Sequence, residues 1–223
     1  MTPDPQAVLW DMDGLLVDSE PLWTVAETEL ARRLGGSFSE ELKASIVGTR
    51  LDVAVPLILQ WYGYDPEPGR VSASCAWLLS RMTELFAEPL PLLPGVAGLL
   101  ADLGTAGVPM ALVSSSYRVL VDAVLAHGVG PFDVAIGGDE LPRGKPDPLP
   151  YTTAAFRLGV EPTGCVVLED SPAGVASGLA AGCAVLAVPS VAGVVFPDHP
   201  RLAVRACLAD VSRRDLAALL RPG

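Results

Sequence analysis

The stretch AVLWDMDGLLVDSE (residues 7–20) decides the fold. Its first four residues are apolar, and Asp11 and Asp13 come next, which is the pattern of a short buried strand with carboxylates at its C-terminal end. Similar apolar runs recur at residues 108–114, 133–138, 164–170 and 184–189. Helix-like stretches lie at residues 95–106, 117–127, 148–158 and 172–181. This alternation predicts an α/β fold with a doubly wound, mostly parallel sheet.

A long segment separates the first predicted strand from the second. Within it, residues 21–34, 51–62 and 70–88 carry helical periodicity, and no run resembles a strand. A crossover between neighbouring strands does not need this length. We therefore expect a helical domain at residues 17–90, inserted into an α/β core domain formed by residues 1–16 and 91–223.

The composition excludes several classes of protein. Half of the 223 residues are apolar, and the formal net charge of −11 argues against a nucleic-acid partner, which would need a basic face. No apolar run is long enough to span a membrane, and the first residues lack the regions of a signal peptide. We expect a cytoplasmic protein. The four cysteines form no CxxC pair, which disfavours a zinc or redox motif and favours reduced side chains.

Polar residues follow four of the predicted strands. Because the carboxyl ends of parallel strands meet at one edge of the sheet, these side chains are expected to converge on one crevice. Neighbouring carboxylates repel each other, so such a site favours a divalent cation. The residues concerned are Asp11 and Asp13, Ser114, Ser115 and Ser116, Lys145, and Glu169 with Asp170.

Two of these features have simpler explanations. Lys145 is one of only two lysines among fifteen cationic residues, which suggests a role that arginine does not fill, but it could also be a solvated loop residue. Glu169 and Asp170 precede Ser171 and Pro172, a helix N-cap and first helical residue, and acids near a helix N-terminus are favourable without any catalysis.

Four strings, DMDGLLVDSE, ALVSSS, GKPDP and LEDSPAGVASGLAAG, resemble in their order and spacing the haloacid dehalogenase superfamily. The resemblance covers essentially the whole chain. It is to the branch that carries a helical cap after the first strand, and most of all to sugar-phosphate phosphatases of the 2-deoxyglucose-6-phosphatase type. β-Phosphoglucomutases share the same core strings.

The resemblance implies a role for each matching residue. Asp11 would be the nucleophile that forms an aspartyl-phosphate, and Asp13 would be the general acid and base. Mg²⁺ would be bound by the Asp11 carboxylate, the Asp13 backbone carbonyl and Asp170. Glu169 would orient the waters of the metal and pair with Lys145.

The remaining implied roles concern the substrate. Ser114 and the backbone of Ser115 would hold phosphate oxygens together with Lys145. Arg50 matches an arginine of the cap that reaches toward the substrate in relatives, although a solvated position at a helix start explains it nearly as well. Trp23 lies where mutases carry a histidine, and this departure argues against mutase activity.

The sequence thus predicts a monomeric, Mg²⁺-dependent phosphatase of a small phosphorylated metabolite, a sugar or polyol phosphate. The alternative is an isomerase of the β-phosphoglucomutase type, which would return the phosphoryl group to the same sugar. A third class, a catalytically silent binding protein, is disfavoured by the intact set of acids.

Overall fold

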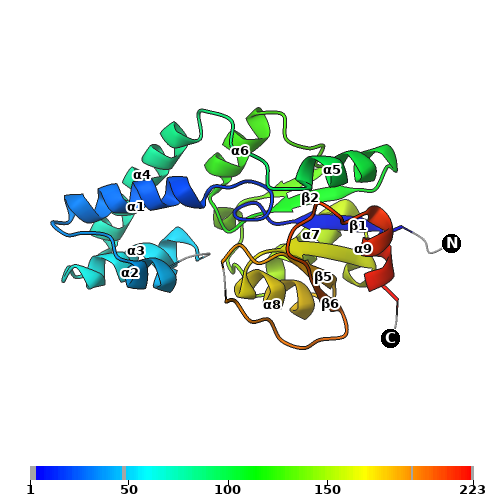
Figure 1. Ribbon diagram of the computed structural model, residues 1–223. Helices are drawn as coiled ribbons and strands as arrows, with labels where there is room; N and C mark the ends of the chain where they lie inside the picture. The colour runs from blue at the N-terminus through cyan, green and yellow to red at the C-terminus, as the bar shows by residue number, and fades with distance from the viewer. Residues whose placement is uncertain (1–3, 47–48, 192, 222–223) are drawn as a thin grey trace.

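The computed structural model describes residues 4–46, 49–191 and 193–221. Within these ranges the strands form a six-stranded sheet in which every neighbouring pair is parallel, in the order β3-β2-β1-β4-β5-β6 (Figure 1). β2 and β3 extend the sheet on one side of the central β1, and β4, β5 and β6 extend it on the other side. The predicted doubly wound parallel sheet is therefore confirmed. The strands are β1 (Ala7–Trp10), β2 (Met110–Val113), β3 (Val134–Ile136), β4 (Cys165–Glu169), β5 (Ala184–Ala187) and β6 (Leu202–Val204).

Alternation along the strands divides the core into two layers. In β1, Val8 and Trp10 belong to one apolar cluster, while Ala7 and Leu9 belong to the other. The first cluster receives side chains from α5 (Val96–Thr105), α6 (Arg118–Ala126) and α9 (Arg213–Leu219). The second receives them from α7 (Leu149–Leu158) and α8 (Pro172–Ala180). Because both faces are covered, the strands read as continuous apolar runs rather than alternating ones.

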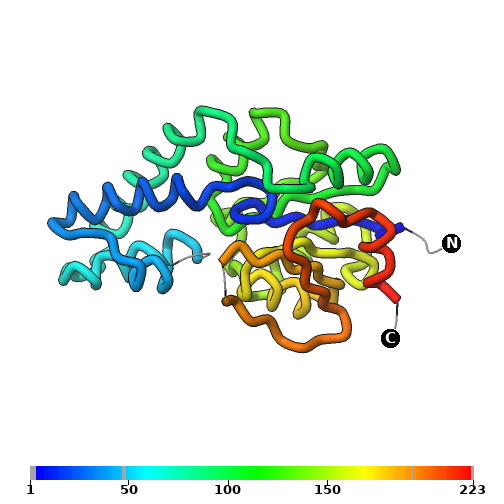
Figure 2. The backbone as a smooth tube through the Cα atoms, in the orientation of Figure 1, coloured from blue at the N-terminus to red at the C-terminus, as the bar shows by residue number. Residues whose placement is uncertain are grey.

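Four helices occupy the segment between β1 and β2. They are α1 (Glu20–Arg33), α2 (Glu40–Ile46), α3 (Leu51–Trp61) and α4 (Pro68–Leu85), and they pack against one another. The tube view places this bundle at one end of the molecule and α9 at the other (Figure 2). The bundle therefore lies beyond the sheet and covers neither of its faces.

Three elements were not predicted from the sequence: β6, α2 and α9. β6 has three residues at the edge of the sheet, all of them half-buried or exposed. α2 and α9 have seven residues each, which is about two turns. Segments this short show too little periodicity to be recognised, and tertiary packing stabilises them.

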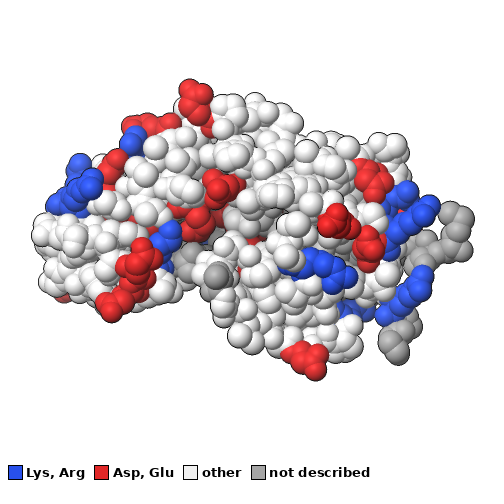
Figure 3. Space-filling view, in the orientation of Figure 1, with Lys and Arg blue, Asp and Glu red and all other residues white. Residues whose placement is uncertain are grey.

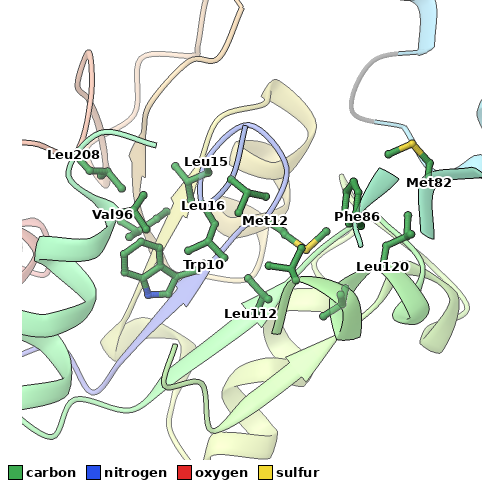
Figure 4. Close-up of a cluster of buried hydrophobic side chains, with 14 of the residues drawn as sticks. Trp10, Met12, Leu15, Leu16, Met82, Phe86, Val96, Leu112, Leu120 and Leu208 are labelled. Atoms are coloured by element: carbon green, nitrogen blue, oxygen red, sulfur yellow. The ribbon is translucent and has the colours of Figure 1, made fainter. Parts of the chain in front are cut away.

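An apolar seam joins the bundle to the sheet. The loop after β1 contributes Met12 and Leu16, which belong to the same cluster as Met82 and Phe86 at the end of α4 (Figure 4). These side chains are almost fully buried. The loop that carries Asp11 and Asp13 is consequently fixed by packing on its apolar side, which holds its polar side in place.

No helix within the described ranges is long and apolar enough to cross a membrane.

The four cysteines are free thiols, two of them buried and two half-buried. On the face drawn in Figure 3, acidic side chains gather in the region where the bundle meets the sheet. The reduced state expected for the cysteines agrees with the structure.

Candidate active site

The carboxyl edge of the sheet opens into a cavity of about 490 Å³ that also reaches the inserted helices. Residues from the two directions of the sheet meet there, as the sequence pattern predicted. Its lining from the sheet side comprises Asp11, Asp13, Ser115, Ser116, Lys145, Asp170, Ser171, Pro172, Ala173, Ser190, Val191 and Val194. A volume of this size is typical of small-molecule sites.

Lys145 lies at the floor of this cavity. Its ammonium group donates to the Asp11 carboxylate, to Glu169 Oε1 at 2.6 Å and to the Val113 carbonyl oxygen at 2.9 Å. Only 4% of the side chain is exposed, so the solvated-loop explanation is wrong. Burial alone would lower the pKa of Lys145, but the charges of Asp11 and Glu169 outweigh it and hold the pKa above its usual value. The lysine is therefore a permanent buried cation.

Glu169 is completely buried and fully hydrogen-bonded. Its Oε2 accepts from the backbone N–H of Asp170 and Ser171 and from the Ser171 hydroxyl, at 3.0 to 3.1 Å. Tyr151 donates its hydroxyl to Oε1 at 2.8 Å. Burial would raise the pKa of Glu169, but the charge and hydrogen bond of Lys145 and the bonds from Tyr151 and Ser171 keep it below its usual value. The side chain stays ionised and orients the lysine.

Gly174 explains how this carboxylate fits beneath a helix. A Cβ on Gly174 would lie 1.7 Å from Glu169 Oε1, which no packing arrangement allows. The glycine lets the first turn of α8 approach the carboxylate closely, and Ser171 caps that turn by accepting from Gly174 N–H at 3.1 Å. The N-cap inferred from the sequence is thus present, and it operates together with the buried ion pair.

Three carboxyl groups could share a metal ion. Asp11, Glu169 and Asp170 each offer an oxygen, and these oxygens lie within 4.8 Å of one another. Burial, and then the charge of Glu169, raises the pKa of Asp170 to about 8, although Ser190 and Lys145 oppose the rise. Burial also raises the pKa of Asp11 well above its usual value. Buried, mutually repelling oxygen donors of this kind fit a hard divalent cation, which would neutralise them.

The loop after β1 closes tightly on this cluster at Gly14. Its backbone is left-handed, with φ of +79°, and a Cβ there would lie 2.5 Å from Asp170 Oδ2. Only glycine adopts this conformation and also leaves room for the carboxylate. Gly14 therefore allows the residues after β1 and after β4 to share one site.

Asp13 is held apart from the acidic cluster by four donors. Its Oδ1 accepts from Ser19 Oγ at 2.6 Å and from Trp23 Nε1 at 3.3 Å. Its Oδ2 accepts from Ser114 Oγ at 3.0 Å and from Ser116 Oγ at 2.8 Å. The first pair comes from the start of α1 and the second from the loop after β2. The Asp13 side chain therefore links the inserted helices to the sheet edge, and it does not belong to the three-carboxyl cluster.

Arg50 does not line the cavity. It precedes α3, and its guanidinium pairs with Asp52 at 3.0 Å and donates to the Leu141 carbonyl oxygen at 3.1 Å. Its aliphatic part also packs on Gly144, where a Cβ would lie 2.6 Å from Arg50 Cδ. The side chain is 16% exposed and is not among the residues that line the cavity. It connects the inserted helices to the loop that carries Lys145.

The inserted helices supply the far wall of the cavity. Their lining residues are Glu20, Trp23, Glu27, Lys43, Ala44, Ile46, Thr49, Leu51 and Ala54. Of these, the sequence analysis singled out only Trp23, as the residue that stands where mutases carry a histidine. It also missed Tyr151, Ser19 and Ser190, since nothing in their local strings distinguishes them from ordinary helix and loop residues. One sequence signal could have identified Glu27. It follows Trp23 by four residues and therefore lies on the same face of the helix.

Comparisons with known proteins agree with this geometry. A family model described as haloacid dehalogenase-like hydrolase matches residues 5–182. Hexitol phosphatase B of Escherichia coli (strain K12) is 35% identical over 217 residues, covering 96% of this chain and 93% of the relative. Hexitol phosphatase A of the same strain is 38% identical over 200 residues, covering 87% and 85%.

A solved structure shares the complete architecture. CbbY from Rhodobacter sphaeroides, determined as a mutant in complex with xylulose-(1,5)bisphosphate, is 27% identical with a TM-score of 0.84, and the match covers 95% of this chain and 99% of CbbY. The resemblance inferred from the four sequence strings is thereby confirmed. The chain belongs to the haloacid dehalogenase-like hydrolase family, and it is a phosphatase.

Proposed function

We propose that the protein hydrolyses the phosphate monoester of a small sugar or polyol, in a Mg²⁺-dependent reaction that passes through an aspartyl-phosphate on Asp11. The observation that carries the proposal is the buried contact of Lys145 with both Asp11 and Glu169, at the floor of a cavity sized for a small molecule. The names of the two hexitol phosphatases support a sugar or polyol phosphate as the substrate.

In the first step, an Asp11 carboxylate oxygen attacks phosphorus, and the bond from phosphorus to the ester oxygen breaks. Asp13 gives its proton to the departing alcohol. Lys145 offsets the negative charge that gathers on the phosphoryl oxygens, and Ser114 with the Ser115 backbone positions them. Phosphoryl transfer depends on such positioning and charge neutralisation more than on covalent assistance.

In the second step, Asp13, now a carboxylate, removes a proton from water, and the resulting oxygen attacks the phosphorus of the acyl-phosphate. The bond between phosphorus and the Asp11 oxygen breaks, which restores the carboxylate and releases inorganic phosphate. Mg²⁺, held by Asp11, Asp170 and the Asp13 backbone carbonyl, would supply further neutralisation of the phosphoryl charge. Glu169 keeps the Lys145 side chain oriented during both steps. Arg50 has no role in this scheme.

The direct test is phosphate release from a panel of phosphorylated metabolites, with Mg²⁺ and with a chelator. Asp11→Asn should abolish turnover, because an amide cannot form the acyl-phosphate. Asp18→Asn, an exposed carboxylate of the same loop, is the matched control and should keep its rate. Turnover by Asp11→Asn at the rate of the control, or full activity in chelator, would contradict the mechanism.

The isomerase alternative predicts a different product from the same assay. A mutase would convert a hexose 1-phosphate into the 6-phosphate with little inorganic phosphate, whereas the phosphatase releases inorganic phosphate from both. The Trp23 indole, which donates to Asp13, stands where mutases have a histidine, so we favour hydrolysis.

The proposal extends to the organisation of the protein. We propose that residues 17–90 act as a cap on a core of residues 1–16 and 91–223, and that the protein works as a cytoplasmic monomer. Light scattering should give the mass of one chain. A dimer mass would contradict the monomer, and it would leave the chemistry at Asp11 unaffected.

A further inference from the structure

The far wall of the cavity has an unusual pattern of charge. We call it the α1–α2 wall and define it by Glu20, Trp23 and Glu27 of α1 and Lys43 of α2. It faces the same cavity as Asp11 and Lys145, so a substrate whose phosphate rests near Lys145 would extend its remaining groups toward this wall. The charges of the wall therefore determine which groups are accepted there.

Lys43 is already neutralised within the wall. Its ammonium lies 3.5 Å from a Glu20 carboxylate oxygen and donates to the Thr24 hydroxyl. At the opposite end, Lys145 is paired with Asp11 and Glu169. Among the described residues that line the cavity, these two lysines are the only cations. Lys145 therefore provides the cationic charge for one phosphate at the floor of the cavity. The wall has no unpaired cation for a second anionic group.

Glu27 differs from its neighbours because it lacks a partner. No group in the described part of the chain donates a hydrogen bond to its carboxyl or forms an ion pair with it. Burial, and then the charge of Glu20, raises its pKa to about 8, with Lys43 opposing the rise. A carboxyl group in such a position is costly unless something bonds to it, and a hydroxyl group, which both donates and accepts, suits either of its protonation states.

We propose that the α1–α2 wall selects the substrate, with Glu27 binding a hydroxyl group of a neutral polyol body and the lack of an unpaired cation in the wall disfavouring a second phosphate or carboxylate. This inference rests on the proposed phosphatase function and narrows it to monophosphates of uncharged, polyhydroxylated compounds. The Lys43–Glu20 pair offers a further donor and acceptor to neighbouring hydroxyls. Trp23 contributes an apolar surface for the carbon chain and, through its indole N–H, keeps the wall connected to Asp13.

The experiment measures kcat/KM for three probes: sorbitol 6-phosphate, fructose 1,6-bisphosphate and p-nitrophenyl phosphate, which has no hydroxyl groups to reach the wall. The wild-type protein should prefer the hexitol monophosphate over the bisphosphate by at least about 100-fold, since a second phosphate would be desolvated at a wall that has no unpaired cation to receive it. Glu27→Leu, which removes both the donor and the acceptor, should lower kcat/KM for sorbitol 6-phosphate by about 10- to 100-fold and lower that for p-nitrophenyl phosphate much less. Glu27→Lys should shift the preference toward the bisphosphate.

Glu41→Gln is the matched control, because Glu41 is an exposed acid on α2 outside the cavity, and all three kcat/KM values should stay at the wild-type level. Thermal unfolding of each variant at the assay pH shows whether folding is intact. A Glu27→Leu protein that is folded and keeps the wild-type ratio between the probes would overturn the inference, as would an equal loss on all three. Failure of the wild-type protein to hydrolyse even p-nitrophenyl phosphate would overturn the proposed function itself, and the inference with it.

Discussion

Replacing Lys145 with methionine removes the buried cation and keeps an unbranched side chain that is one atom shorter. At 2.6 Å from Glu169 Oε1, the pair has a gross attraction of about 6 kcal/mol at an effective dielectric constant of about 20. Part of this attraction only offsets the cost of desolvation. Breaking a buried pair by removing one partner generally costs about 3–5 kcal/mol, because a charge is left buried alone. We therefore expect Lys145→Met to lower the free energy of unfolding by about 3–5 kcal/mol at pH 8.

The loss should depend on pH in a defined direction. Lys145 holds the pKa of Glu169 below its usual value, so this pairing stabilises the fold above the usual carboxyl pKa, and the contribution disappears as the pH falls through the lowered pKa. In the variant Asp11 and Glu169 can take up protons, which is easier at pH 5 than at pH 8. The difference from wild type should accordingly be smaller at pH 5.

Urea unfolding in chelator at the two pH values measures this, and a phosphate-release assay measures turnover, which should fall by about 10²–10³-fold or more. Lys145→Arg should also lose kcat, because the planar guanidinium does not fit the three acceptors around a single nitrogen. Arg143→Met is the matched control, two residues away, with a side chain 66% exposed and paired with Asp147. Its free energy of unfolding should change by less than about 1 kcal/mol. If Lys145→Met unfolds like the control and keeps its rate, the role assigned to the buried ion pair is wrong.

Three further predictions concern single positions. Asp170→Ala should raise the Mg²⁺ concentration for half-maximal activity far more than the KM for substrate; a metal titration that overlays the wild-type curve would disprove its role as a ligand. Gly174→Ala should lower Tm strongly, because the new Cβ would lie 1.7 Å from Glu169 Oε1. Its control is Gly98→Ala in α5, where no atom lies within 4 Å of the new Cβ, and this variant should raise stability by about 0.5–1 kcal/mol. Equal Tm shifts in the two variants would contradict the close approach of Gly174 to Glu169. The pKa of Glu27, about 8 in the fold, lies above the value of 4.5 in the unfolded chain, so the folded state keeps a proton that the unfolded state has lost, and this group weakens stability as the pH rises from about 4.5 to about 8. Glu27→Gln should therefore gain free energy of unfolding relative to wild type across that interval, and a difference that is constant from pH 5 to pH 8 would refute the raised pKa.

The sequence alone determined the architecture and the chemical identity of the sheet edge. Short apolar runs that end in Asp11, Ser114 and Glu169 are local signals, and in a parallel sheet the end of each strand has a known location. For that reason the convergence of residues more than 150 positions apart was predictable without coordinates. The inserted helices were predictable too, because their periodicity extends over several turns and the segment is too long for a crossover.

Tertiary structure alone decided the details that control specificity. The pattern of the sequence did not show that Arg50 donates to Leu141, that Tyr151 bonds to Glu169, or that Glu27 lines the cavity with no hydrogen-bond partner among the residues that the structure describes. Side-chain direction and hydrogen-bond partners across elements depend on how the helices pack against the sheet, and sequence spacing carries no record of that packing. The short elements β6, α2 and α9 escaped prediction for a related reason, since neighbouring segments, rather than their own periodicity, give them their stability.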